Sequence, residues 1–321
     1  MPAIVTLTMN PALDITTSAE AVVPTEKVRC GPPRYDPGGG GINVARVVRV
    51  LGGDALAVFP AGGPSGLALE GLLDRDGVPH ERIPVDGATR ESFTVDERRS
   101  GQQYRFVLPG PHLSDAEQRR CVEALTRRAA GARFIVASGS LPPGVPPDFF
   151  QRIADEARSL GARFMLDTSG EALRRMRSGV YLLKPSIREL RECVGRALRD
   201  EAEQADAARG LVTAGIAEVV VVSLGAEGAL VVSGHGAERL PPIRVPVRSA
   251  VGAGDSMVAA IAFGLVQGLD LHGAVRLGMA AGAATLMTPG TELCRREDVE
   301  RLHAASMAGA AGRPGTARTT A

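Results

Sequence analysis

Cysteine is scarce in this 321-residue chain, and the four that occur lie far apart. They are Cys30, Cys121, Cys193 and Cys294, and no two of them form a Cys-x-x-Cys pair. Zinc sites and disulfide frameworks depend on regularly spaced cysteines, so the sequence argues against both. Thiols of this kind are typical of a reducing compartment, and we therefore expect a cytoplasmic protein.

A strong charge of either sign and long apolar runs are also missing. The 37 basic and 36 acidic residues leave a formal net charge of +1, which gives no overall field to attract nucleic acid or an anionic membrane. No stretch reaches the roughly 18 apolar residues that a membrane span needs. Residues 1–14 lack the basic start and apolar stretch of a signal peptide. We expect no nucleic-acid or membrane partner, and any anion site must be local.

Short apolar runs that alternate with helical patterns are abundant. Hydrophobic residues make up 44% of the sequence, an ordinary share for a globular protein with a large core. Runs typical of buried strands occur at 3–8, 134–137, 164–166, 181–183 and 219–223. Helical spacing occurs at about 42–51, 114–130, 148–160, 254–267 and 271–287. This alternation predicts an α/β fold with a mostly parallel central sheet flanked by helices.

Two segments interrupt this rhythm and predict a second, smaller sheet. Residues of about 15–35 and 91–107 alternate more like strands and carry several charges, so we expect them to project from the main body. No internal repeat or long linker divides the chain, which predicts a single domain over residues 1–305. Residues 306–321 are rich in Ala, Gly, Thr and Arg without apolar periodicity, and we expect a disordered tail there.

The string Gly252-Ala253-Gly254-Asp255 stands directly before a strongly helical pattern. Small residues let the backbone approach a ligand, and the free N–H groups at a helix start bind anions. A carboxylate in this place can accept the proton of an alcohol that attacks a phosphoryl group. An aspartate that merely caps the helix gives the same local pattern, and the string alone favours that simpler interpretation.

A run of four glycines, Gly38 to Gly41, precedes an earlier helix and is followed closely by Asn43. Successive glycines are costly unless the backbone must adopt unusual angles or approach a ligand closely. Asn43 takes the last glycine position of Gly-x-Gly-x-x-Gly, and no segment matches Gly-x-x-x-x-Gly-Lys-Ser/Thr. Dinucleotide-binding and Walker-type loops therefore lack support.

Other polar residues follow predicted strands, where α/β proteins place their ligands. Asp14 follows the first strand and can hold sugar hydroxyls, although a turn residue is the simpler interpretation. Lys184 and Ser223 begin loops after two later strands, and each loop alone is an ordinary turn. Arg90 and Arg105 lie in or beside the projecting segments and suit bidentate phosphate contact, although solvation at the surface is the default for either one.

Together these strings resemble the ribokinase-like (PfkB) family of sugar kinases. The resemblance runs in order from Thr6 to about Val299, and its signature is the glycine run ending in Asn43 with the later Gly252 to Asp255. This pairing, in the family's order, marks Asp255 as the catalytic base. The resemblance implies a three-layer ribokinase-like fold with a small β lid over 15–35 and 91–107. It also implies a homodimer formed through the two lids.

Within the family, the chain is most similar to the minor-type bacterial 6-phosphofructokinases, through residues 38–46, 103–107 and 138–144. The related 1-phosphofructokinases and tagatose-6-phosphate kinases share much of this pattern. The former often carry lysine within the glycine run, where this chain has glycine. The resemblance thus implies transfer of the ATP γ-phosphate to O1 of fructose 6-phosphate, with Mg²⁺. A kinase for tagatose 6-phosphate or fructose 1-phosphate is the alternative, and a catalytically weak sugar-phosphate-binding regulator is an alternative of another class.

The resemblance also implies roles for individual residues. The catalytic group would be Gly252, Ala253, Gly254 and Asp255. The sugar phosphate would be held by Asp14, Gly39, Gly40, Asn43, Arg90, Arg105 and Ser138, with Lys27 reaching the neighbouring subunit's site. ATP would be contacted by Lys184, Ser186, Ser223, Gly225 and Gly228. Metal ions would involve Glu189, for Mg²⁺ through water, and, for a monovalent cation such as K⁺, Ser249, Val251, Thr288 and Gly290.

The chain departs from the family pattern at one position. The family's Asn-x-x-Glu, which takes part in magnesium handling, reads Ser186-Ile187-Arg188-Glu189 here. A serine hydroxyl can still orient water, but it is shorter than asparagine and has no amide. We therefore expect activity to persist and the details of magnesium handling to differ.

Overall fold

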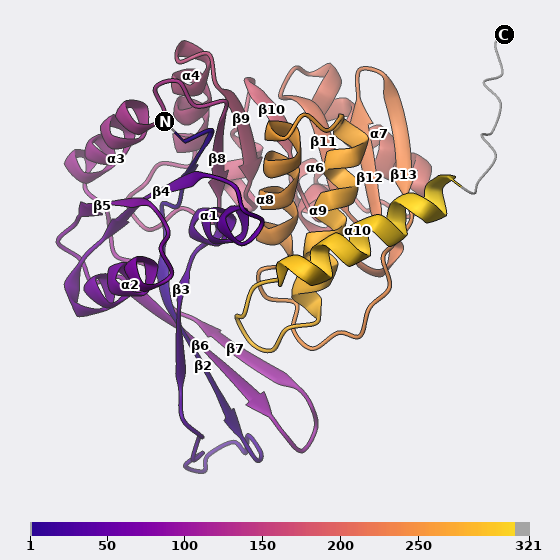
Figure 1. Ribbon diagram of the computed structural model, residues 1–321. Helices are drawn as coiled ribbons and strands as arrows, with labels where there is room; N and C mark the ends of the chain where they lie inside the picture. Colours follow the sequence, from indigo (N-terminus) through magenta and orange to yellow (C-terminus); the bar gives the residue numbers. More distant parts are fainter. Residues whose placement is uncertain (1, 312–321) are drawn as a thin grey trace, which may run out of the picture.

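A nine-stranded sheet forms the centre of the computed structural model, which describes residues 2–311 (Figure 1). The strand order is β13-β12-β11-β10-β9-β8-β1-β4-β5. Pairing is parallel from β11 to β5, and β12 pairs antiparallel with both β11 and β13. The prediction of a mostly parallel sheet is confirmed. The strands are β1 (Ile4–Leu7), β4 (Ala55–Ala61), β5 (His80–Pro84), β8 (Phe134–Ser138), β9 (Arg163–Asp167), β10 (Val180–Leu183), β11 (Ala217–Ser223), β12 (Ala229–Ser233) and β13 (Gly236–Leu240).

Helices cover both faces of this sheet and make three layers (Figure 1). Successive side chains of a strand point to opposite faces, so Ile4 of β1 packs into one core cluster and Val5 into the other. The first face carries α1 (Gly40–Val50), α2 (Gly63–Arg75), α8 (Ala253–Val266), α9 (Leu271–Leu286) and α10 (Arg296–Ala311). The second carries α3 (Asp115–Arg128), α4 (Phe149–Ser159), α5 (Gly170–Arg174), α6 (Ile187–Val194) and α7 (Glu201–Thr213).

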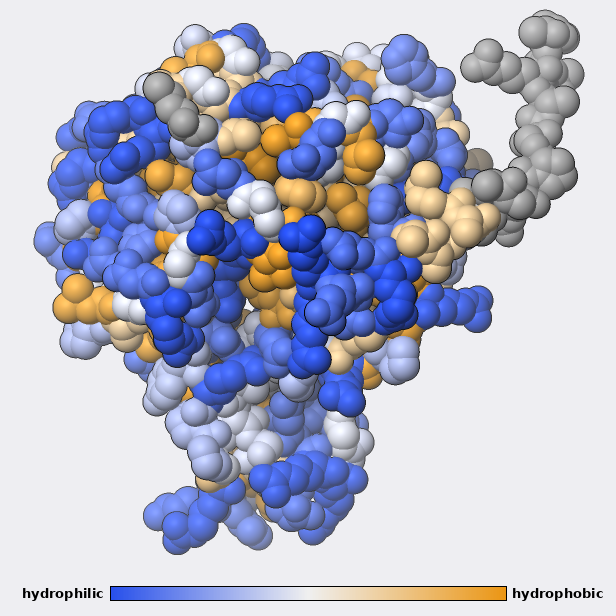
Figure 2. Space-filling view, in the orientation of Figure 1, coloured by the Kyte–Doolittle hydropathy of each residue, from blue (hydrophilic) through white to orange (hydrophobic). Residues whose placement is uncertain are grey.

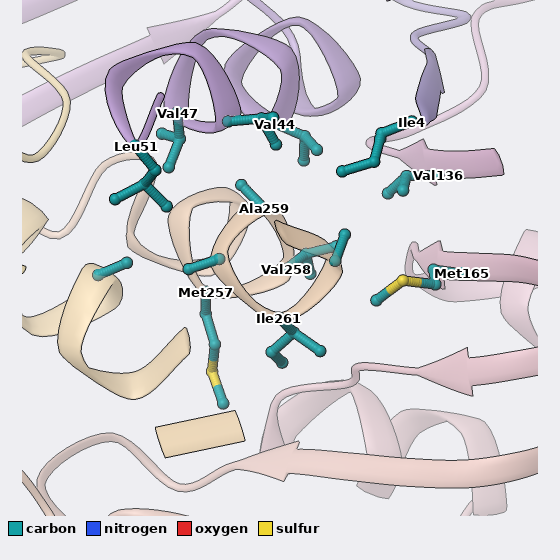
Figure 3. Packing of buried hydrophobic residues seen from close by; sticks show 14 of the residues in the cluster. Ile4, Val44, Val47, Leu51, Val136, Met165, Met257, Val258, Ala259 and Ile261 are labelled. Atoms are coloured by element: carbon teal, nitrogen blue, oxygen red, sulfur yellow. The ribbon is translucent and has the colours of Figure 1, made fainter. Parts of the chain in front are cut away.

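Helix α8 is largely enclosed by its neighbours on the first face, and this packing holds its first turn in place. Val258, Ala259 and Ile261 are fully buried. Figure 3 shows these side chains between those of α1 on one side and those of the central strands on the other. Because interiors pack as densely as crystals, the start of α8 is held firmly against α1 and the carboxyl ends of the strands.

A separate four-stranded sheet projects from the body as a lid, in the order β3-β2-β6-β7 (Figure 1). Its strands are β2 (Ala12–Ala19), β3 (Arg34–Gly38), β6 (Arg90–Glu97) and β7 (Gln103–Val107). The predicted segments 15–35 and 91–107 overlap these strands, but residues 20–33 form a loop instead of continuing the strand pattern. Pro24, Pro32 and Pro33 lie in this stretch and lack the N–H group that a sheet needs.

The end of the described chain corrects one expectation. A disordered tail was predicted from Ser306, but α10 continues to Ala311, so the prediction is wrong over residues 306–311. Alanine, the best helix former, recurs through these turns, and Val299 and Leu302 anchor the preceding turns in the core. The remainder of the predicted tail, residues 312–321, lies outside the described residues.

The surface is mainly hydrophilic on the face that Figure 2 shows, including the tip of the lid. None of the helices within residues 2–311 combines the length and apolar character needed to cross a membrane. Several of the large apolar side chains that reach the surface lie on lid strands or in the segment after β7, namely Tyr35, Phe93, Phe106, Val107 and Leu108, and the others are scattered.

Candidate active site

Asp255 lies in the first turn of α8, and both of its carboxylate oxygens are held by other elements. Asn43 of α1 donates from Nδ2 to Oδ2 at 3.0 Å. Ser138, the last residue of β8, donates from Oγ to Oδ1 at 2.9 Å. Gly252 precedes the helix with φ of 75°, a left-handed conformation that favours glycine. The structure thus brings together Asp255, Asn43 and Ser138, all three singled out in the sequence.

The glycine run lies against the same group. A Cβ on Gly40 would stand 2.2 Å from Ser138 Oγ, and one on Gly38 would stand 2.2 Å from Asp14 Oδ2. Gly39, the N-cap of α1, has φ of 111°. Thr8 was not identified from the sequence, and its Oγ1 accepts a hydrogen bond from the backbone N–H of Ile42 at 2.7 Å. The run is therefore glycine because its backbone lies directly against neighbouring side chains.

A buried ion pair stands beside the start of α8. Lys184 Nζ lies 3.2 Å from Asp167 Oδ1, and the Lys184 side chain is only 4% exposed. A Cβ on Gly254 would lie 3.5 Å from Lys184 Nζ and 3.7 Å from Asp167 Oδ2. Asp167 was not identified from the sequence, although a carboxylate directly after the predicted strand 164–166 was an available signal.

Burial and neighbouring charge set the ionisation of this pair. Burial raises the pKa of Asp167 to about 6; the Lys184 ammonium opposes this shift, and Asp255 and Glu189 add to it. Burial alone would lower the pKa of Lys184, but the carboxylates of Asp167, Glu189 and Asp255 outweigh it and raise that pKa. Lys184 is therefore a fixed positive charge among three carboxylates.

Asp14 lies on β2, at the root of the lid, where several charged side chains converge. Burial raises its pKa to about 6, while Arg90, Arg105 and Arg46 oppose the shift. The half-buried Arg90 donates to the backbone carbonyls of Asn10 at 3.0 Å and Leu108 at 3.2 Å. Arg105 is exposed on β7. The predicted Lys27 is exposed in the loop between β2 and β3.

Replacing Asp14 with asparagine is expected to raise the free energy of unfolding at pH 8 by about 1–3 kcal/mol. The Asp14 pKa is raised from 3.8 to about 6, so the native state is penalised as the pH rises from 3.8 through 6. Below 3.8 both states hold a protonated carboxyl, and the penalty disappears. Urea unfolding of both proteins at pH 3.5 and pH 8 measures the difference. The exposed Asp54 serves as the control, because Asp54→Asn should leave stability unchanged. If Asp14→Asn raised the free energy of unfolding equally at both pH values, the stabilisation would not come from the Asp14 pKa.

A cavity of about 280 Å³ lies between the start of α8 and the loop after β11. Its lining includes three predicted ATP residues, Ser223, Gly225 and Gly228, together with Ala253 and Gly254. Its remaining walls are mainly apolar: Pro242, Ile243, Ala250, Met257, Met279, Gly282, Ala283 and Leu286. A mostly apolar cavity of this kind, next to free helix N–H groups, suits a flat base carrying phosphates.

Ser186 and Glu189 form a capping box at the start of α6. The Glu189 N–H donates to Ser186 Oγ at 3.3 Å, and the Ser186 N–H donates to Glu189 Oε2 at 2.7 Å. The Ser-x-x-Glu spacing also indicates a capping box from the sequence alone. Glu189 nevertheless lies close enough to influence both Asp167 and Lys184. The two residues therefore stabilise a helix start beside the ion pair.

Three of the four residues predicted to hold a monovalent cation meet in one place. Ser249 Oγ donates to the carbonyl of Gly290 at 2.7 Å, and the N–H of Val251 donates to Ser249 Oγ at 3.3 Å. Thr288 lies in the same loop as Gly290 and turns its hydroxyl to the carbonyl of Thr285 at 2.7 Å. Hydroxyl and carbonyl oxygens are hard ligands of the kind that alkali cations use.

The lid root is tied to this loop by contacts that the sequence did not reveal. The buried Thr291 donates to Asp36 of β3 and lies 3.1 Å from the hydroxyl of Thr16 of β2. Arg34 bonds Asp36 at 2.8 Å and Glu292 at 3.3 Å. These lid-root contacts join β2, which carries Asp14, and β3 to the loop that follows α9.

A mostly parallel sheet with a β lid and a carboxylate at a glycine-rich helix start are typical of sugar kinases. Comparison with known proteins supports this class. Residues 7–298 match the model of the pfkB family carbohydrate kinases. The chain belongs to this family.

Two relatives and one solved protein are similar along nearly the whole chain. The "ATP-dependent 6-phosphofructokinase isozyme 2" of Mycobacterium tuberculosis is 60% identical over 301 residues, which is 94% of this chain and 89% of the relative. The Escherichia coli protein of the same name is 41% identical and covers 95% and 99% of the two chains. A crystal structure of E. coli phosphofructokinase-2 in complex with potassium matches with a TM-score of 0.91, covering 96% and 100%. Other structures of that protein contain fructose-6-phosphate or show a tetrameric inhibited form.

Proposed function

We propose that this chain is an ATP-dependent 6-phosphofructokinase, which transfers the γ-phosphate of ATP to O1 of fructose 6-phosphate. The observation that carries the proposal is the carboxylate of Asp255, held by Asn43 and Ser138 at the first turn of α8. The names of the relatives at 60% and 41% identity support the choice of substrate.

Asp255 acts as the general base in this proposal. Its carboxylate takes the proton of the O1 hydroxyl as that oxygen attacks the γ-phosphorus. The backbone N–H groups of Ala253, Gly254 and Asp255 follow Gly252 and have no intrahelical partner at a helix start. They stabilise the negative charge that develops on the transferred phosphoryl group.

The sugar phosphate lies under the lid, between the glycine run and the lid root. Asp14 and Asn43 hold its hydroxyls, helped by Ser138 and the backbone of Gly39 and Gly40. Arg90 and Arg105 hold its phosphate, with the exposed Arg105 the freer of the two because Arg90 already bonds backbone carbonyls. Closure of the lid then excludes water, which prevents wasteful hydrolysis of ATP.

ATP occupies the cavity between the β11 loop and the start of α8. Ser223, Gly225 and Gly228 line the base and sugar, Ser186 lies close by, and Lys184 neutralises phosphate charge. Within residues 2–311, no three His, Cys, Asp or Glu side chains cluster with metal-site geometry. The three carboxylates around Lys184 nevertheless leave excess negative charge that suits a hard divalent cation.

Two metal ions belong to this proposal. Glu189 would hold Mg²⁺ through water, together with the ATP phosphates, and the bound ion would supply positive charge that neutralises those phosphates. The oxygens of Ser249, Val251, Thr288 and Gly290 suit K⁺, and the potassium complex of the E. coli protein supports this assignment.

We also propose a cytoplasmic homodimer formed through the lids, with residues 1–305 as one kinase domain. The exposed side chains of Tyr35, Phe93 and Phe106 lie at matching positions of β3, β6 and β7, so they share one face of the lid sheet and make an apolar surface for a second copy. Lys27, at the exposed lid loop, then reaches the neighbouring subunit's site. The tetrameric inhibited form of the E. coli protein shows that this relative assembles.

Coupled ADP release, with ATP, Mg²⁺ and K⁺ present, tests the substrate assignment. We expect kcat/KM for fructose 6-phosphate to exceed that for tagatose 6-phosphate and for fructose 1-phosphate by at least about tenfold, which corresponds to about 1.4 kcal/mol of discrimination. A preference for either of the other sugars would keep the mechanism and overturn the substrate. Binding of all three without turnover would instead favour a regulator.

A further inference from the structure

A second cavity, of about 510 Å³, lies outside the proposed active site, between β13, α9 and α10. Its size is in the range of small-molecule pockets. Its apolar lining comes from the coil after β13 and from the two helices: Pro241, Pro242, Ile243, Met279, Leu302 and Ala305. Glu238, Arg239, Arg276 and Ser306 add polar groups. The cavity therefore offers an apolar interior with a few charged side chains around it.

Arg276 is the one charged group of this lining that lacks a close partner among the described residues. Its side chain is only 16% exposed, and the nearest carboxylate oxygen, Glu238 Oε1, is 3.9 Å away. The second oxygen of Glu238 lies 2.8 Å from His272 Nε2. Arg239, by contrast, is paired with both Glu201 and Glu227. The guanidinium nitrogens of Arg276 are not among the buried polar atoms without a partner, so they stay accessible at the cavity wall. They can therefore donate charge-assisted hydrogen bonds to an acceptor that a ligand supplies.

The charges around the cavity limit what this ligand can be. An anionic group suits Arg276, while Glu238 lines the same space and repels additional negative charge. A carboxylate with a single charge therefore fits better than a phosphate dianion. The apolar lining requires that the rest of the ligand be hydrocarbon or aromatic.

The cavity also borders the proposed nucleotide cavity. Pro242, Ile243 and Met279 line both spaces. A ligand in the second cavity would contact one side of these residues, and a nucleotide base would contact the other side. Two ligands that share a wall in this way are expected to change each other's affinity by the same factor.

We propose that this cavity is a ligand site for a small monocarboxylate with an apolar body, bound through Arg276 and coupled to the nucleotide cavity through the shared wall. The coupling rests on the proposed nucleotide site, whereas the binding itself does not. A direct binding measurement therefore separates failure of this proposal from failure of the proposed kinase function.

Calorimetry with 4-phenylbutyrate tests the binding, with 4-phenylbutan-1-ol as the uncharged probe. We expect saturable binding of the acid to the full chain and binding at least about tenfold weaker for the alcohol. Arg276→Gln should weaken binding of the acid by about tenfold or more. Ala305→Trp should abolish it, because the exposed Ala305 lines the cavity and the larger ring would fill it.

Two control variants lie on α10, the helix that carries Ala305. Ala304→Trp places the same ring one residue away, at an exposed position outside the lining. Arg301→Gln removes an exposed arginine that pairs with Asp298. Both should bind 4-phenylbutyrate within about twofold of the parent chain. Binding that Arg276→Gln and Ala305→Trp leave intact, or equal binding of acid and alcohol, would overturn the site. Identical affinity for 4-phenylbutyrate with and without saturating ADP would overturn the coupling.

Discussion

Replacing Asp255 with asparagine is expected to lower kcat by about 10³-fold while the KM for fructose 6-phosphate changes by less than about threefold. Asparagine keeps the size of aspartate, and its amide oxygen can still accept the hydrogen bond from Asn43. Ser138 keeps a partner by turning its hydroxyl to accept from the amide N–H. It cannot accept the proton of the attacking hydroxyl. Coupled ADP release over a range of both substrates measures the two constants separately.

The partners of Asp255 provide the comparison. Ser138→Ala removes one of the two hydrogen bonds that orient the carboxylate but leaves the base in place. Its loss of kcat should therefore be smaller, on the order of tenfold. If Asp255→Asn kept more than about a tenth of the parent turnover, Asp255 would not be the base. An equal loss for both variants would indicate that geometry, and not proton transfer, limits the reaction.

Gly40→Ala is expected to destabilise the protein by about 1–3 kcal/mol and to lower kcat by at least about 100-fold. The added Cβ would stand 2.2 Å from Ser138 Oγ and 2.6 Å from its carbonyl carbon. Because one of these atoms belongs to the backbone, a rotamer change of Ser138 cannot relieve the clash. The end of β8 or the start of α1 must move, and both carry a partner of Asp255. Thermal unfolding and steady-state kinetics on the same preparation measure the two effects.

Gly71→Ala is the matched control for this substitution. Gly71 lies within α2, and an added Cβ would meet nothing within 4 Å. The change should leave kcat unchanged and raise the free energy of unfolding by up to about 1 kcal/mol, because alanine favours the helix. Full activity in Gly40→Ala would mean that the glycine run is a flexible loop and not a close-packed wall of the site.

The order of elements and the two glycine-rich helix starts could be predicted from the sequence because they depend on local patterns. Short apolar runs and helical periodicity indicated strands such as 134–137 and helices such as 254–267, and the structure places β8 and α8 there. The resemblance to a known family then linked Gly40 to Asp255 across the intervening chain. Roles for those residues remain predictions that the experiments above test.

The residues that were missed act through long-range contacts. Thr8 and Thr291 have no special sequence context, whereas Asp167 directly follows a predicted strand. Each of the three matters because of a neighbour from another part of the chain. Asp167 is defined by Lys184 across adjacent strands, and Thr291 by Asp36 of the lid. The second cavity likewise depends on how α10 lies against α9, which periodicity does not determine. Local sequence patterns predict helices and strands, whereas tertiary packing determines which polar groups come into contact.

The hydrogen bond between Asn43 and Asp255 joins residues that are 212 positions apart in the sequence. This separation along the chain has a consequence during synthesis. Asn43 leaves the ribosome long before Asp255, and α8 is among the last elements made. Because the α1–α8 contact is apolar, the nascent chain holds α1 with an uncovered hydrophobic face until α8 arrives. A translation product that ends before α8 cannot contain Asp255 bonded to Asn43 and Ser138. The appearance of catalytic activity in a timed translation reaction would therefore report completion of the fold.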